Sequence, residues 1–187
     1  MTKSTDKFIH FRTQSSYSML ESAIKIEDLV DLTKKSGMTA VCLSDRGNLF
    51  GSLEFSLEAT KARIQPICGV ILNISFSHKK LEQDFAEILI IAKDGVGYKN
   101  LLKLVSYSFI KNDRSICNHI TFDDLKDCNE GLIILSAYTK GIIGKLLLNG
   151  SYDEAIQKTK KLVSIFDNRF YFEIMRHGYA KERQIES

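Results

Sequence analysis

Short apolar segments alternate with helical patterns along this 187-residue chain, and the alternation limits the fold more than any other feature. The runs at 40–43, 66–75 and 87–92 have the length and the β-branched content of buried strands. The repeats of three to four residues in 27–36 and 153–166 predict amphipathic helices. Strands that alternate with helices are typical of βαβ units with a parallel sheet. The sequence therefore predicts an α/β fold.

Weaker signals extend this alternation over nearly the whole chain. We expect further strands at 8–11, 132–136 and 169–174, and further helices at 52–63, 97–110 and 139–150. One face of the helix at 27–36 should carry Leu29, Val30, Leu32 and Thr33, and Gly37 should end that helix in a left-handed conformation. Since no linker or repeat interrupts the sequence, we expect a single domain over residues 1–187.

Composition and charge argue against several classes of protein. With 44% hydrophobic and 26% charged residues, the chain is neither disordered nor a coiled coil. A net charge of +3 is low for a domain that binds nucleic acid by itself through phosphate contacts. The four cysteines are too far apart for a zinc ribbon or a CxxC motif, which indicates a reducing compartment. No signal sequence or membrane span is recognisable, so we expect a soluble, cytoplasmic protein.

Loops at the carboxyl ends of parallel strands usually carry the function of such a fold. Two of them have distinctive sequences here, HFRTQSSYSMLE at 10–21 and LSDRGNLFG at 43–51. Together with segments 66–70, 92–106, 131–144 and 167–178, they resemble the N-terminal PHP (polymerase and histidinol phosphatase) domain of the alpha subunit of bacterial DNA polymerase III. The resemblance extends over about residues 8–184.

The resemblance implies a distorted (β/α)7 PHP-type barrel. In active members, His, Asp and Glu side chains at the strand ends hold up to three metal ions, which neutralise phosphate and activate water for phosphoester hydrolysis. A further Asp-x-His motif of the family should lie just beyond residue 187. The chain is therefore expected to lack its C-terminal strand or strands and to be a marginally stable, self-associating fragment.

This sequence departs from the family pattern at the positions expected to bind metal. Arg12 and Gln14 stand where the resemblance implies two ligand histidines, Arg46 replaces the histidine of an Asp-His-Gly motif, and Ile71 replaces a glutamate. An arginine remains protonated and cannot ligate a cation. We expect the metal site to be lost, with no catalytic residue and no metal ligand in this chain.

Seven residues define what we call the vestigial cleft: His10, Arg12, Gln14, Glu21, Asp45, Arg46 and Ile71. We expect His10 to make structural hydrogen bonds, and Asp45 to brace the SDRGN turn by bonding to nearby backbone, with Arg46 or Arg12 as a further partner. The two arginines either bind an anion or close the cleft through salt bridges, and acidic neighbours favour salt bridges. Glu21 occupies the acidic position after the first motif.

The resemblance also implies a function and partners. The leading hypothesis is a noncatalytic domain of a replicative DNA polymerase, which supports the polymerase fold, docks the proofreading exonuclease subunit and meets DNA only through the full-length protein. The domain itself would need no cofactor, whereas Mg²⁺ is expected in the absent polymerase domains. The alternative is an enzyme, a metal-dependent phosphoesterase or 3′–5′ exonuclease.

Overall fold

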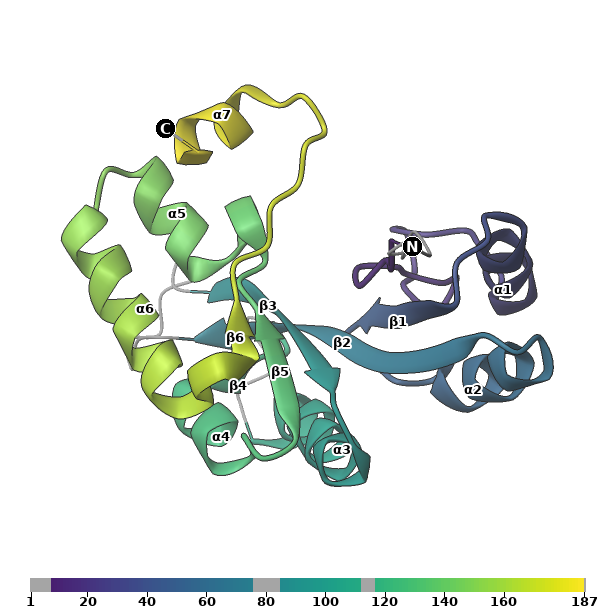
Figure 1. Ribbon diagram of the computed structural model, residues 1–187. Helices are drawn as coiled ribbons and strands as arrows, with labels where there is room; N and C mark the ends of the chain where they lie inside the picture. The colour runs from purple at the N-terminus through teal and green to yellow at the C-terminus, as the bar shows by residue number, and fades with distance from the viewer. Residues whose placement is uncertain (1–7, 76–84, 112–116, 187) are drawn as a thin grey trace, which may run out of the picture. The chain divides into compact units, whose positions relative to one another are not determined.

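The computed structural model describes residues 8–75, 85–111 and 117–186 (Figure 1). The chain divides into two compact units, residues 1–70 and residues 71–187. The first unit contains α1 (Ile26–Lys35), β1 (Ala40–Arg46), α2 (Ser52–Lys61) and the first part of β2 (Gln65–Ser75). The second contains the rest of β2, followed by β3 (Phe85–Ala92), α3 (Gly95–Ile110), β4 (Ile120–Thr121), α4 (Phe122–Asp127), β5 (Leu132–Leu135), η2 (Tyr138–Lys140), α5 (Ile142–Leu148), α6 (Tyr152–Phe166), η3 (Asp167–Arg169), β6 (Phe170–Tyr171) and α7 (Ala180–Glu186).

The first unit buries β1 against one face of each of its two helices. Its core is an apolar cluster made by Ile26, Leu29, Val30, Val41, Leu43, Phe55, Ala59 and Ile64. The expectation that Leu32 joins the buried face of α1 is wrong, because Leu32 is exposed. At 100° per residue it falls outside the arc that the buried residues of α1 occupy. Gly37 does adopt the left-handed conformation expected after this helix, with φ +70°.

The predicted strand at 8–11 is not a regular strand. The segment runs beside β1 in the same direction, where Cys42 N donates to His10 O (2.9 Å) and Ser44 N donates to Thr13 O (2.7 Å). The two bonds are two residues apart on β1 and three apart on its partner. This mismatch places an extra residue in the segment, as in a β-bulge, and interrupts a regular ladder.

The second unit is a mixed sheet rather than the all-parallel sheet that the alternation predicts. Its strands lie in the order β4, β2, β3, β5, β6. β2 pairs with β4 and β5 pairs with β6 in parallel, but β3 pairs with β5 antiparallel, with Ile90 opposite Ile134. Only nine residues separate the neighbouring strands β2 and β3, fewer than the dozen or so that a parallel crossover needs, so this pair does not fit the predicted parallel arrangement either. The α/β class itself is confirmed.

Glycine allows a close approach between α3 and the turn before β5. The Asp94 carboxylate accepts hydrogen bonds from Val96 N (3.0 Å) and Gly97 N (2.9 Å) and so caps α3. A Cβ atom at Gly97 would lie 1.8 Å from the carbonyl oxygen of Gly131, so no larger residue fits without movement of the backbone.

Among the described residues, no helix combines the length and the hydropathy that a bilayer crossing demands.

Candidate functional site

The buried carboxylate of Asp45 organises the loop that follows the 8–14 segment. Asp45 lies near the end of β1 and is only 2% exposed. It accepts hydrogen bonds from Ser15 N (2.7 Å), Ser15 Oγ (2.8 Å) and Ser18 Oγ (2.6 Å). Ser18 Oγ in turn accepts from Arg46 N (3.0 Å). Both oxygens of Asp45 are therefore engaged by neutral donors of the 15–18 loop.

This arrangement differs from the predicted role of Asp45 in the SDRGN turn. That turn is held instead by Asn48, whose Nδ2 donates to Arg46 O and Tyr17 O (both 3.0 Å) and whose Oδ1 accepts from Phe50 N (3.1 Å). Ser15 and Ser18 were missed by the sequence analysis. The sequence signal that could have identified them is the spacing of two hydroxyls three residues apart, just after the segment expected to be a strand.

Glu21 is the second acidic residue of the vestigial cleft, and it connects two other members. Arg46 Nε lies 2.5 Å from Glu21 Oε1, in an ion pair without the alignment of a hydrogen bond at that nitrogen. Gln14 Nε2 donates to the other carboxylate oxygen of Glu21 (2.9 Å). Because both charged side chains are partly exposed, solvent screening limits the energy of the pair. The ion pair nevertheless joins the 14–21 loop to β1.

Three further residues complete the vestigial cleft as the sequence defines it: His10, Arg12 and Ile71. His10 is exposed, its imidazole ring lies edge-on to Phe8 with centroids 4.7 Å apart, and its backbone oxygen accepts the bond from β1. Arg12 is half-buried. Ile71 is buried within β2, in the second unit. Within residues 8–75, 85–111 and 117–186, no group of three or more His, Cys, Asp or Glu residues could hold a metal ion.

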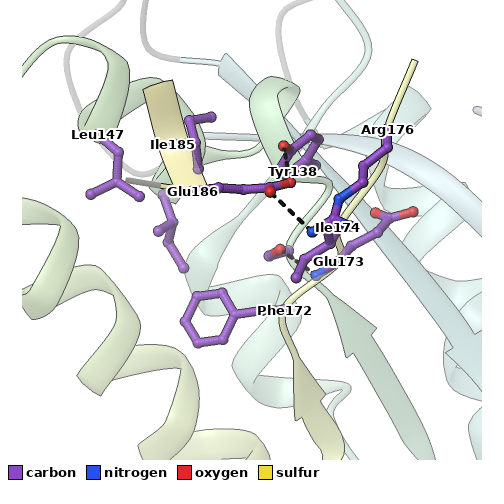
Figure 2. Close-up of a pocket in the computed structure, with 11 residues that line it drawn as sticks. Tyr138, Leu147, Phe172, Glu173, Ile174, Arg176, Ile185 and Glu186 are labelled. Carbon is purple, nitrogen blue, oxygen red and sulfur yellow. Dashed lines mark hydrogen bonds and ion pairs between the residues drawn. The ribbon is translucent and has the colours of Figure 1, made fainter. Parts of the chain in front are cut away.

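A pocket of about 400 Å³ lies in the second unit, beside the turn that follows β5 (Figure 2). Its apolar walls include Leu147 of α5 and, after β6, Phe172 and Ile174. Tyr138 of η2 and Glu186 of α7 supply polar groups next to one another. No sequence motif marks this pocket, because its walls come from segments up to about 50 residues apart.

Helix α7 is fastened to this pocket through two of its glutamates. The Tyr138 hydroxyl lies 3.1 Å from both Glu182 O and Glu186 Oε1, and Arg176 Nη2 lies 3.2 Å from Glu186 Oε2. Arg176 is the cation among the lining residues, and this ion pair neutralises its charge. The pocket therefore suits an apolar group better than a phosphate.

The carboxylate of Glu182 closes the turn that precedes α7. It accepts from the backbone N–H groups of His177 (2.9 Å), Gly178 (2.9 Å) and Tyr179 (3.1 Å). His177 Nδ1 lies 3.0 Å from its other oxygen. Burial alone would raise the pKa of Glu182, but the hydrogen bonds from these residues outweigh it and lower the pKa below its ordinary value. The ionised form of Glu182 therefore stabilises the start of α7.

Comparisons with known proteins place the chain in a family. A model of the PHP domain matches residues 10–177. DNA polymerase III subunit alpha from Rickettsia prowazekii (strain Madrid E) is 58% identical over 181 residues, which cover 97% of this chain and 15% of that protein. The Borreliella burgdorferi subunit is 38% identical over 178 residues, 92% of this chain and 15% of that protein. The chain thus spans about 15% of the length of these relatives.

Among solved structures, an amidohydrolase from Chromobacterium violaceum matches with a TM-score of 0.38 and 18% identity, over 53% of this chain and 33% of that one. This similarity is too low for any feature of that protein to be transferred. The family match over most of the chain and the identity with the alpha subunits stand without it. They show that the chain belongs to the PHP domain family and corresponds to the N-terminal region of DNA polymerase III subunit alpha.

Proposed function

We propose that this chain is the N-terminal PHP domain of a cytoplasmic, replicative DNA polymerase alpha subunit and is itself noncatalytic. Its role is to support the fold of the polymerase and to dock the proofreading exonuclease subunit. DNA synthesis, the contacts with DNA and the Mg²⁺ that synthesis needs belong to the rest of the polymerase. The correspondence with alpha subunits supports the first part of this proposal, and the chemistry of the vestigial cleft supports the second.

The observation that carries the noncatalytic role is the ion pair of Arg46 with Glu21. A guanidinium group is a permanent cation without a lone pair for a metal. It lies against the one exposed carboxylate of the vestigial cleft, and a divalent cation there would have to displace it or be repelled by it. The other carboxylate, Asp45, is buried and accepts three hydrogen bonds. This donor set does not fit a catalytic metal centre.

Metal content tests the noncatalytic role. The protein is incubated with Zn²⁺ and Mn²⁺, dialysed exhaustively and analysed by elemental mass spectrometry, and hydrolysis of bis(p-nitrophenyl) phosphate is measured on the same samples. We expect less than about a tenth of an equivalent of either metal and no hydrolysis above buffer. One retained equivalent that is lost in Glu21→Ala, with hydrolysis lost in parallel, would establish the metal-dependent phosphoesterase or exonuclease instead.

Docking is tested separately, by titrating the chain with the proofreading exonuclease subunit of the same organism in a calorimeter. We expect a 1:1 complex with a micromolar or lower Kd, of the order typical for specific protein pairs. No heat of binding at concentrations of about 100 μM would refute the docking role.

A further inference from the structure

Helix α2 has two apolar faces, and only one of them is buried. Phe55 and Ala59 lie in the core of the first unit and are fully buried. On the other side, Leu53 and Leu57 are 72% and 63% exposed, and Phe50, just before the helix, is 74% exposed. Single exposed apolar residues are ordinary on protein surfaces, but neighbouring large ones mark an interaction site.

Leu53 and Leu57 lie one turn apart on α2, and Phe50 stands just before the helix; we call these three exposed residues the α2 stripe (Phe50, Leu53 and Leu57). The spacing of four residues keeps Leu53 and Leu57 within one narrow arc of a helix with 3.6 residues per turn, and Phe50 precedes Leu53 by three residues, two positions before the first helical residue. Partner helices dock on this spacing, because side chains at i, i+3 and i+7 fill the groove between ridges of a second helix.

The α2 stripe is held in place by the structure beneath it. Phe55 N donates to Gly51 O (2.9 Å), and Phe50 N donates to Asn48 Oδ1 (3.1 Å), so the backbone that carries Phe50 is fixed before the helix begins. A Cβ atom at Gly51 would lie 2.9 Å from the Tyr17 ring, which shows how closely the loop packs there. A preorganised surface loses little entropy when a partner binds.

Acidic residues border the α2 stripe along one side. Glu54 and Glu58 follow Leu53 and Leu57 by one residue each, so both lie on the same flank of the helix. The Tyr17 hydroxyl donates to Glu54 Oε2 (3.0 Å) and orients that carboxylate. Lys61, at the end of the helix, pairs only loosely with Glu58 (3.5 Å). A partner with basic residues beside its apolar face complements this flank.

A second copy of this chain is a poor occupant. In an antiparallel two-fold pairing of the α2 stripe with itself, the two-fold axis leaves the flanks on the same side of the interface. Glu54 and Glu58 of one chain would then lie beside the same residues of the other, and like charges that face each other oppose association.

We propose that the α2 stripe is the surface that docks the proofreading exonuclease subunit, through an amphipathic helix that carries Lys or Arg beside its apolar face. This inference rests on the proposed function, which names the subunit but no surface. The exposed apolar residues supply the affinity, and the acidic flank fixes the orientation of the incoming helix and accelerates its approach.

The test is the calorimetric titration of the exonuclease subunit with variants of the chain. Leu53→Glu combined with Leu57→Glu places charge in the centre of the interface and should weaken binding by at least about 30-fold, as loss of a hot spot does. The control is Leu32→Glu on α1, a leucine that is 53% exposed and lies outside the α2 stripe, which should leave Kd within about threefold.

The acidic flank is tested by charge reversal. Glu58→Lys should weaken binding by roughly three- to tenfold and reduce its dependence on salt, whereas Asp31→Lys, an exposed acid on α1, should do neither. Far-UV circular dichroism confirms that each variant folds, as exposed positions allow. Hydrogen exchange of α2 in the wild-type complex should slow down independently of any variant.

The outcomes separate this inference from the function on which it rests. Equal binding of the wild type and the α2 stripe variant would overturn the surface and leave the docking role intact. No binding of the wild type would overturn both. A wild-type homodimer that the α2 stripe variant abolishes would assign the surface to a second copy and would also overturn the inference.

Discussion

Removing the Asp45 carboxylate should strongly destabilise the first unit. Three donors bond to this carboxylate at 2.6–2.8 Å, and its side chain is almost completely buried. Hydrogen bonds to a charged group contribute about 1.5–3 kcal/mol each, and their effects are not additive, because the Ser15 and Ser18 hydroxyls can turn toward other partners. We expect Asp45→Ala to lower the free energy of unfolding by about 4 kcal/mol, which corresponds to roughly 8–16 °C in Tm for a chain of this size.

A graded set of variants makes this prediction specific. Asp45→Asn keeps the shape and one acceptor oxygen, so it should cost about half as much as the alanine variant. Ser18→Ala removes one donor and should cost about 1–2 kcal/mol. Ser16→Ala, an exposed serine in the same loop, is the control and should stay within about 0.5 kcal/mol of the wild type.

Urea unfolding followed by far-UV circular dichroism measures these differences, and hydrogen exchange at the Ser15 amide reports the loop directly. The Ser15 amide should exchange much faster in Asp45→Ala than in the wild type, because its acceptor is gone. A cost below about 1 kcal/mol for Asp45→Ala, with the Ser15 amide still protected, would show that the loop does not depend on this carboxylate.

Three other predictions concern the rest of the chain. Gly97→Ala should lower the free energy of unfolding by about 1–3 kcal/mol or more, because the added methyl group meets Gly131 O. Gly95→Ala has open space around it and should be neutral or slightly stabilising. Equal melting temperatures of the two variants would contradict this prediction. The pKa of Glu182 is lower in the folded protein than its ordinary value of 4.5, so its contribution is complete above about pH 4.5 and is lost as the pH falls through the lower folded pKa. The protection factor of the Tyr179 amide, which compares its exchange rate with that of an unfolded chain at the same pH, should therefore fall between pH 7 and pH 3, and an unchanged protection factor at pH 3 would count against this role. Burial raises the pKa of the Cys42 thiol and keeps reagents away from it. At pH 8 this thiol should therefore react with Ellman's reagent at least about 100-fold more slowly in the native protein than in urea. Comparable rates would mean that β1 is accessible to the reagent.

Much of the fold could be predicted because its strong elements carry local signals. Helix α6 was expected at 153–166 and spans Tyr152–Phe166, and the long strand β2 begins within one residue of its predicted start. Both have a periodicity that tertiary contacts reinforce. By contrast, the strand expected at 169–174 is reduced to Phe170–Tyr171, although every residue from 170 to 172 is aromatic. Propensity favours a strand there, but pairing requires a neighbour in register, which composition does not reveal.

The vestigial cleft illustrates a similar limit at the level of side chains. The sequence identified Glu21, Asp45 and Arg46 as members, and it favoured salt bridges over anion binding for the arginines. It did not indicate which acid would meet which partner. The buried carboxylate of Asp45 accepts bonds from the short, neutral side chains of Ser15 and Ser18. The partly exposed carboxylate of Glu21 pairs with the long, charged side chain of Arg46, which can stay in contact with solvent there. Which donor meets which carboxylate depends on how deeply each carboxylate is buried, and a sequence does not show this.

The contact between Arg46 and Glu21 also affects how easily substitutions could turn this cleft into a metal centre. A substitution that placed a histidine at position 46 would remove the guanidinium that pairs with Glu21 and would still leave too few ligands for a metal. Each single step toward a working centre would thus lose an existing interaction before it gained a new activity. Stepwise selection cannot easily cross such an interval, so under the proposed function the ion pair would act as an evolutionary ratchet, and the domain would be retained for what it binds.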